Sequence, residues 1–94
     1  VITARPVSDG NLLVYPTAFS NVINIEYTAE DQSALEIVLT DVAGKVIVRQ
    51  QAATEKGFNK IQMRNLEGIA AGNYFIKILN ADFDEKFIIK VQKK

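Results

Sequence analysis

The last part of the sequence alternates apolar residues with other residues in two runs that a short polar stretch separates. Tyr74, Ile76 and Ile78 occupy every second position of the run 72–80, and the run 84–92 repeats the pattern. A period of two residues is typical of β-strands, and two such runs joined by a turn predict a hairpin. The closing element is therefore predicted to be a hairpin arm that carries lysines.

Five earlier segments are also predicted to be extended, and one of them has an alternative. The apolar residues of segment 34–42 also fit one face of a helix. We assign a strand because Leu35, Ile37 and Leu39 alternate with their neighbours, and because a turn signal at 41–44 ends in a glycine suited to a positive φ. The predicted strands cover residues 12–15, 22–28, 34–40, 45–51, 58–64, 73–80 and 85–92.

Seven short strands at regular spacing, with no long helix, predict an all-β fold: an Ig-like antiparallel β-sandwich of about seven strands. A length of 94 residues fits one domain. We interpret residues 1–10 as a linker or N-terminal arm and residues 11–94 as the domain. Because the chain begins with Val1, we expect it to have been cut or processed out of a longer protein.

The inward alternates of these strands form the predicted core. They are Leu13, Ile23, Ile25, Leu35, Ile37, Leu39, Val46, Val48, Ile61, Met63, Leu66, Tyr74, Ile76, Ile78, Phe87, Ile89 and Val91.

The net charge of zero conceals a division between the two halves of the chain. Residues 1–44 carry six acidic residues against one basic residue, and residues 45–94 carry ten basic residues against five acidic ones. This division has two interpretations. Oppositely charged strands can pair within the fold, or the C-terminal half can offer a basic face to a partner.

The chain contains no His and no Cys, which removes the commonest general base, the thiolate nucleophile and the best zinc ligands. The acidic groups Glu30–Asp31 and Asp82/Asp84–Glu85 have oxygens that calcium accepts, but solvated turns are the favoured interpretation because neither group has the dense alternation of a calcium loop. We therefore predict no cofactor, no metal and no enzymatic activity. A small hydrolase would require a cleft with perturbed carboxylates.

Nucleic acid and membrane are also disfavoured as direct partners. Lys77, Lys86, Lys90 and Lys94 with Phe75 imitate a basic and aromatic surface, but the pI of about 6.4 argues against a strong phosphate footprint. Lysines on an edge strand also protect against aggregation. No apolar run approaches the ~20 residues of a membrane helix, so we predict no direct membrane insertion.

Motifs along the chain follow one another in a defined order, which matters more than any one of them. They are LVYPTAFSN at 13–21, DVAGKV at 41–46, GFNKI at 57–61, the segment from Leu66 through GNYFIKI at 72–78, and the lysine-rich end. Together these motifs resemble the type A C-terminal sorting domain of type IX (Por) secretion system cargo, over about residues 11–94. Thr17 and Ala18 depart from the Asn-Pro that this family favours after Tyr-Pro, and two residues more than in the family's pattern precede Gly72.

The resemblance implies a secretion address rather than a catalyst. Such domains are Ig-like sandwiches that follow an N-terminal cargo, pass through the periplasm, and are recognised by the outer-membrane type IX translocon. A sortase-like peptidase usually removes them, so that the cargo reaches the cell surface or is secreted. By this resemblance the processing region lies within or before residues 1–10.

The sequence predicts two groups of functional residues, one for recognition by the translocon and one that determines the fold. The last strand must stay accessible to be recognised, and strand addition to its edge is one mode of recognition. Lys86, Lys90, Lys93 and Lys94 are therefore the predicted translocon-recognition residues, with a solubilising edge as the other interpretation. The motif residues predicted to determine the fold are Tyr15, Pro16, Asp41, Gly44, Lys45, Gly72 and Tyr74.

An alternative function is an Ig-like carbohydrate- or protein-binding module, or a spacer module, of an extracellular enzyme or adhesin. A carbohydrate site would require exposed and coplanar aromatic rings, and the chain has no Trp. The candidate rings are Phe19, Phe58, Phe75 and Phe83.

Overall fold

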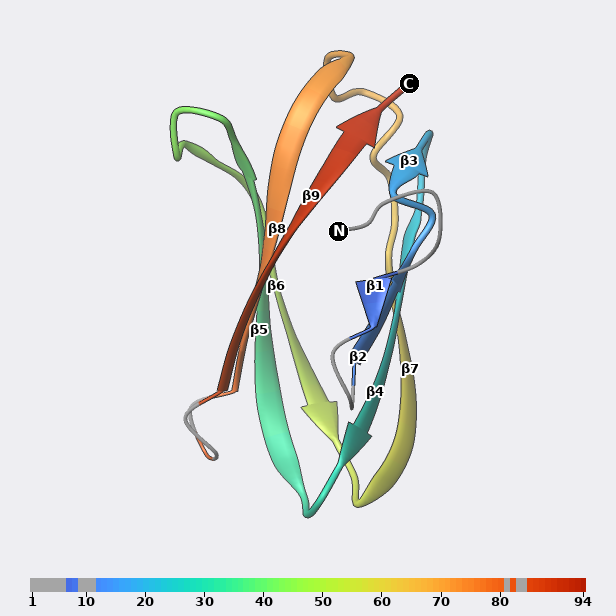
Figure 1. The fold of residues 1–94 in the computed structure, drawn as a ribbon, viewed down its shortest axis with the longest axis vertical. Coiled ribbons are helices and arrows are strands. Elements are labelled where there is room, and N and C mark those ends of the chain that lie inside the picture. The colour runs from blue at the N-terminus through green and yellow to red at the C-terminus, as the bar shows by residue number, and fades with distance from the viewer. Residues whose placement is uncertain (1–6, 9–11, 81, 83–84) are drawn as a thin grey trace.

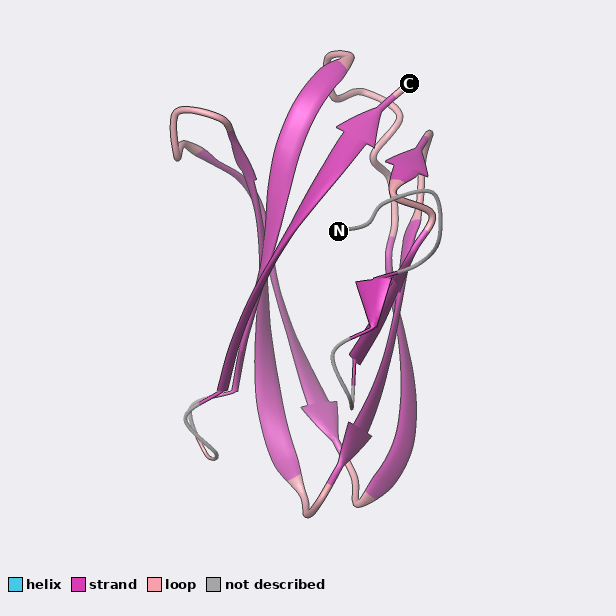
Figure 2. Cartoon of the chain, in the orientation of Figure 1, coloured by secondary structure: helices cyan, strands magenta, loops and turns pink. Residues whose placement is uncertain are grey.

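The computed structural model describes residues 7–8, 12–80, 82 and 85–94, and it forms two β-sheets packed face to face (Figure 1). Every regular element among these residues is a strand (Figure 2), so the predicted all-β sandwich is confirmed. Accordingly, the described residues include no helix that could span a membrane. The strands are β1 (Val7–Ser8), β2 (Leu12–Tyr15), β3 (Ala18–Phe19), β4 (Ile23–Ala29), β5 (Ser33–Asp41), β6 (Val46–Thr54), β7 (Gly57–Met63), β8 (Gly72–Asn80) and β9 (Glu85–Lys93).

The seven longer strands correspond to the seven predicted ones, and the helical alternative for residues 34–42 is wrong because β5 occupies this segment. The two additional strands, β1 and β3, have two residues each, which is too short for a period of two to mark them. Within the segment interpreted as an N-terminal arm, Val7 and Ser8 pair with β2.

The four-stranded sheet has the order β1-β2-β4-β7, and the five-stranded sheet has the order β3-β9-β8-β5-β6. All pairings are antiparallel except the one between β3 and β9, which is parallel. The chain therefore changes sheets between β2 and β3, and this crossing brings an early segment against the last strand (Figure 1).

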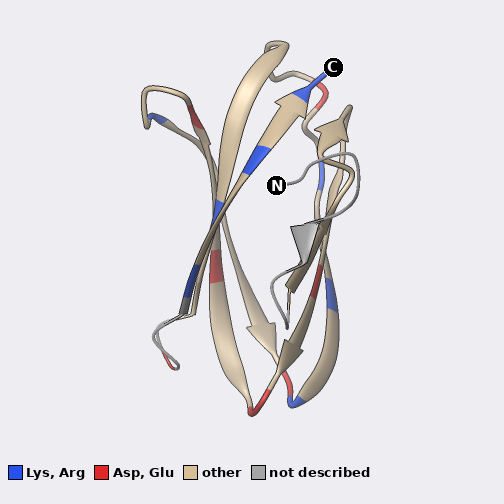
Figure 3. Ribbon diagram, viewed as in Figure 1, with Lys and Arg blue, Asp and Glu red and all other residues tan. Residues whose placement is uncertain are grey.

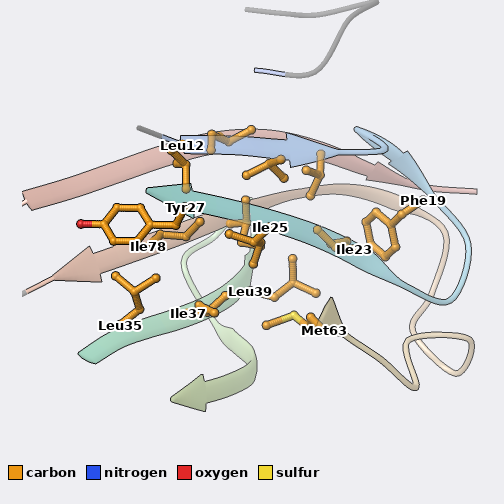
Figure 4. Packing of buried hydrophobic residues seen from close by; sticks show 14 of the residues in the cluster. Leu12, Phe19, Ile23, Ile25, Tyr27, Leu35, Ile37, Leu39, Met63 and Ile78 are labelled. Carbon is orange, nitrogen blue, oxygen red and sulfur yellow. The ribbon is translucent and has the colours of Figure 1, made fainter. Parts of the chain in front are cut away.

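One hydrophobic core fills the space between the sheets (Figure 4). Most of the predicted core residues are in it, and Val48, Ile61 and Phe87 pack against it while partly exposed. The core residues that the alternation did not predict are Leu12, Val14, Phe19, Tyr27 and Ala29.

Two predicted core residues are wrong, for different reasons. Leu13 points away from the core, while Leu12 and Val14 are buried. Because all four residues of β2 are apolar or aromatic, alternation gives no phase there. Val46 is 44% exposed because a β-bulge interrupts the pairing of β5 with β6. Leu39 pairs with Val48, but the next residue of β5 pairs with Val46, so one residue of β6 is skipped. Such a bulge reverses the phase of the residues beyond it.

A small polar cluster closes one end of the core and joins the two sheets. The Asn80 side-chain amide donates to the Tyr27 hydroxyl at 3.0 Å and to the Ser33 hydroxyl at 3.1 Å. Ser33 in turn shares a hydrogen bond of 2.8 Å with the Thr54 hydroxyl. Every buried side-chain nitrogen and oxygen of the described residues has a partner, so the cluster avoids the cost of burying an unpaired polar group.

Candidate recognition surface

The C-terminal end of β9 is held by β3, which follows Tyr15 and Pro16. The Tyr15–Pro16 peptide bond is cis. The Gln92 amide donates to the Thr17 carbonyl at 2.7 Å, and the Lys94 amide donates to the Phe19 carbonyl at 2.9 Å. The segment after Tyr-Pro therefore supplies the backbone partners of the last residues, although Thr17 and Ala18 replace the Asn-Pro that the family favours.

Tyr74 ties the start of β8 to the loop before it. Its hydroxyl donates to the Ala70 carbonyl at 2.6 Å, and its ring meets the buried Phe19 ring edge-on at a centroid distance of 6.5 Å. Gly72 has a φ of 148°, which a side chain would strain. In the same loop, the amide of the fully buried Leu66 donates to the Asn21 carbonyl at 3.1 Å. The Leu-to-Tyr segment and β3 thus support the same end of the sandwich.

The turn between β5 and β6 explains the Asp-x-x-Gly-Lys sequence. One carboxylate oxygen of Asp41 accepts the amides of Ala43 and Lys45, both at 2.9 Å. Gly44 has a φ of 92°, which confirms the positive φ predicted there. Lys45 itself is exposed and contributes backbone groups to this turn. Asp41, Gly44 and Lys45 therefore lie together in this turn, and their role in determining the fold stays a prediction.

Asn59 has a comparable role in the turn between β6 and β7. Its side-chain amide donates to the carbonyls of Glu55 and Gly57, both at 2.9 Å, and to that of Tyr27 at 3.3 Å. Its side-chain oxygen accepts the Glu55 amide at 3.0 Å. The third residue of Gly-Phe-Asn thus fastens the connection that leads the chain from one sheet to the other.

The four predicted recognition lysines fall into two groups. Lys86, Lys90 and Lys94 have exposed side chains, and basic residues recur along β8 and β9 (Figure 3). Lys93 differs because it lies in the inward phase of β9. It is 9% exposed, and its ammonium donates to the Lys94 carbonyl at 3.2 Å. The accessible lysines are therefore on the outward phase of β9 and at residue 94.

The backbone edge of β9 is covered at one end. In the described part of the chain, β3 is the strand on this edge, and it pairs with Gln92 and Lys93. The amides of Gln92 and Lys94 point to β3, and amides alternate in direction along a strand. The amides of Lys86, Ile88 and Lys90 therefore point to the same side, where no described strand pairs with them.

Both interpretations of the charge division find support in the strand register. Glu26 of β4 lies opposite Lys60 of β7, and Glu36 of β5 forms an ion pair with Arg49 of β6 at 3.5 Å. The lysines of β9 form no ion pair among the described residues. Strand pairing thus accounts for part of the division, and the β9 lysines remain available to a partner.

The aromatic candidates for a carbohydrate platform do not come together. Phe19 is buried, and Phe83 lies outside the described residues. Phe58 is 66% exposed on β7 of the four-stranded sheet, whereas Phe75 is partly exposed on β8 of the other sheet. The described rings thus provide no paired stacking surface.

The acidic candidates for a calcium site have other partners or lie outside the description. The Asp31 carboxylate accepts the Gln32 amide at 2.8 Å, and the Asp82 carboxylate accepts the Ala34 amide at 3.1 Å. The first contact is local to its turn, and the second joins the turn after β8 to the start of β5. Asp84 and the Glu85 side chain are outside the described residues. Among the side chains that are described, no three metal-ligating residues gather.

One titrating contact lies on the outer face of the four-stranded sheet. The Tyr15 hydroxyl donates to the Glu26 carboxylate. This hydrogen bond, with smaller effects from burial and from the carboxylate charge, raises the pKa of Tyr15 above its usual value. The contact links β2 to β4 and is remote from the β9 lysines, so it supports the fold rather than the candidate surface.

A family model described as "Secretion system C-terminal sorting domain" matches residues 13–90. The matched segment contains the Tyr-Pro, Asp-x-x-Gly-Lys, Gly-Phe-Asn and Gly-x-Tyr sequences described above. No curated protein matches the chain.

Proposed function

Because this chain belongs to the family of type IX secretion C-terminal sorting domains, we propose that it carries an attached cargo protein to an outer-membrane translocon that recognises its last strand. Family membership makes the domain a sorting signal associated with the type IX secretion system, with export to the cell surface or to the medium as its outcome. The translocon step, the periplasmic route and the removal of the domain belong to the proposal.

The observation that carries the proposal is that two of the sorting motifs, Tyr-Pro and Gly-x-Tyr, converge on the C-terminal end of β9. The segment after Tyr-Pro accepts the backbone amides of Gln92 and Lys94, and the Tyr74 ring contacts Phe19 of β3 edge-on. These two motifs thus support the position of β9. A signal that a receptor reads needs such a rigid and accessible strand.

The proposed recognition residues are Lys86, Lys90 and Lys94, whose side chains are exposed. An extended segment of the receptor adds to the open edge of β9 beside Ile88, where backbone groups face outward. Lys93 acts differently from the other three: its buried stem and its hydrogen bond to the Lys94 carbonyl position the end of the chain.

The proposed fate of the domain is removal after export. A sortase-like peptidase cleaves within or before residues 1–10, ahead of β2. Support comes from the position of β2, which begins at Leu12, so that a cut upstream of it spares all of the longer strands. The domain contributes no chemistry to this step, in keeping with the non-enzymatic family.

The test fuses residues 1–94 to a periplasmic reporter in a host that has type IX secretion. Export of the wild-type fusion is the expected result, and complete periplasmic retention of the folded fusion would contradict the proposal.

In a second fusion, Lys86, Lys90 and Lys94 become Gln, and we expect export to fall severalfold. The matched control changes the exposed Lys56, Lys60 and Arg64 to Gln, which removes the same charge elsewhere. Equal losses in both triple variants would show that net charge, and not the β9 lysines, is recognised.

A further inference from the structure

The outer face of the five-stranded sheet carries an apolar patch around Lys77, which consists of Phe75 and Leu79 on β8, Ile88 on β9 and Val38 on β5. Val38 is 5% exposed although it is not part of the core between the sheets. In the strand register, Val38 of β5 lies opposite Arg49 of β6 on one side and opposite Lys77 of β8 on the other. Ile88 of β9 lies opposite Lys77 on the other side of β8. Phe75 and Leu79 are half-buried, and Ile88 is 54% exposed.

This patch breaks the pattern expected of a sheet that faces water. An antiparallel sheet with one solvated face alternates cleanly between apolar and polar residues, and strands covered on both faces become apolar at nearly every position. β8 has Ile76 and Ile78 inside, and two of its outward residues, Phe75 and Leu79, are also apolar, with Lys77 between them. The outer face of the sheet is therefore more apolar at β8 than a fully solvated face, and no described strand covers it.

Positive charge lies within the patch and beside it. Leu79 lies opposite Lys86, Phe75 lies opposite Lys90, and Lys77 stands between them on β8. None of these three lysines forms an ion pair among the described residues. On the far side of the sheet, Arg49 already has a carboxylate partner in Glu36. Three lysines without an ion pair thus lie on β8 and β9 (Figure 3), and the exposed Ile88 lies opposite one of them, Lys77.

We propose that this outer face is a docking surface for an acidic protein surface with an apolar centre. The inference rests on the proposed function. The partner belongs to the export machinery, and it contacts the outer face of the sheet in addition to the edge of β9. The partner covers Ile88, and its carboxylates meet Lys77, Lys86 and Lys90. Charge complementarity selects such a partner, because a second copy of the chain would bring like charges together.

The test uses the reporter fusion after export of the wild type has been established, so that a failure of the proposed function is seen first and separately. Ile88→Glu is expected to lower export at least tenfold, because it places a like charge against the acidic partner. Ile88→Lys removes the same apolar contact but adds a favourable charge, so its export is expected to fall less. Ile88→Leu should export as the wild type does. Equal losses for Glu and Lys, or a larger loss for Lys, would overturn the acidic partner.

A matched control separates this face from exposed apolar residues in general. Phe58→Ser removes a side chain of similar exposure from the four-stranded sheet and should leave export unchanged. All variants must keep the wild-type thermal unfolding midpoint. Full export of a folded Ile88→Glu fusion would sink the docking surface while leaving the sorting function intact.

Two further measurements distinguish other occupants of the patch. Sedimentation equilibrium of the isolated chain should show a monomer, and an Ile88-dependent dimer would identify a second copy as the occupant. Flotation with vesicles of phosphatidylglycerol should show no Ile88-dependent binding, and such binding would identify a lipid surface. Either positive result would overturn the proposal of an acidic protein partner.

Discussion

The outward side chains of β4 are Asn24, Glu26 and Thr28, all of them polar, whereas the five-stranded sheet turns Val38 and Phe75 outward. The two sheets share one core, so this difference is confined to the faces that point away from it. The outer face of β4 is therefore polar, whereas the outer face of the five-stranded sheet places Val38, Phe75, Leu79 and Ile88 around Lys77. Under the docking proposal, this second face contacts a partner.

The largest expected loss of stability tests whether the two sheets contribute equally to the core that they share. Ile25→Ala in β4 and Ile78→Ala in β8 each remove a fully buried side chain from the same core. Each is expected to lower the free energy of unfolding by about 2–5 kcal/mol, because lost burial and a residual cavity add together. Urea unfolding monitored by circular dichroism measures both. A loss near zero at one site with a full loss at the other would show that the sheets do not share one core.

A smaller loss of stability tests the difference between the outer faces of the two sheets. Val38→Ala on the outer face of the five-stranded sheet is expected to cost about 1–2 kcal/mol, because the side chain is 5% exposed outside the main core. Thr28→Ala on the outer face of the other sheet should change stability by less than about 0.5 kcal/mol. The same urea titration compares the two, and equal costs would remove the distinction between the outer faces.

The smallest effect concerns the polar face alone. The raised pKa of Tyr15 means that the contact with Glu26 stabilises the fold at pH values below the unfolded pKa of about 10. That stabilisation is lost as the pH rises through the higher folded pKa. Wild type and Tyr15→Phe should therefore differ by a constant amount from pH 7 to pH 9 and converge above that range. Thermal melts of both proteins from pH 7 to above the unfolded pKa of about 10 measure this difference. A difference in stability that persists unchanged to high pH would contradict the assigned contact.

The turns and the longer strands of the fold were predictable because each depends on neighbouring residues. Asp41 and Gly44 define their turn through contacts within a few residues. Leu35, Ile37 and Leu39 mark their face through a period of two. The β2 phase was not predictable, since Leu12 and Leu13 are equally apolar and only packing decides which one is inside.

The candidate surface was predictable in part. The lysines of β9 were identified from the sequence, but their accessibility was not uniform, because Lys93 falls on the inward phase of the strand. The apolar patch was missed because Phe75 and Ile88 were taken as the outward residues of an alternating strand. The available signal was that these outward residues are themselves apolar.

By itself the sequence determined an all-β chain, the position of each longer strand, the turns between them and a lysine-bearing end. Those properties follow from local periodicity and local hydrogen bonding. The tertiary structure alone decided that β3 crosses to the other sheet to hold β9, that Val38 is covered on the outer face, and that Lys93 is buried. These outcomes depend on contacts between residues far apart in the chain, whose relative positions are set when the two sheets pack on a common core and not by any local pattern.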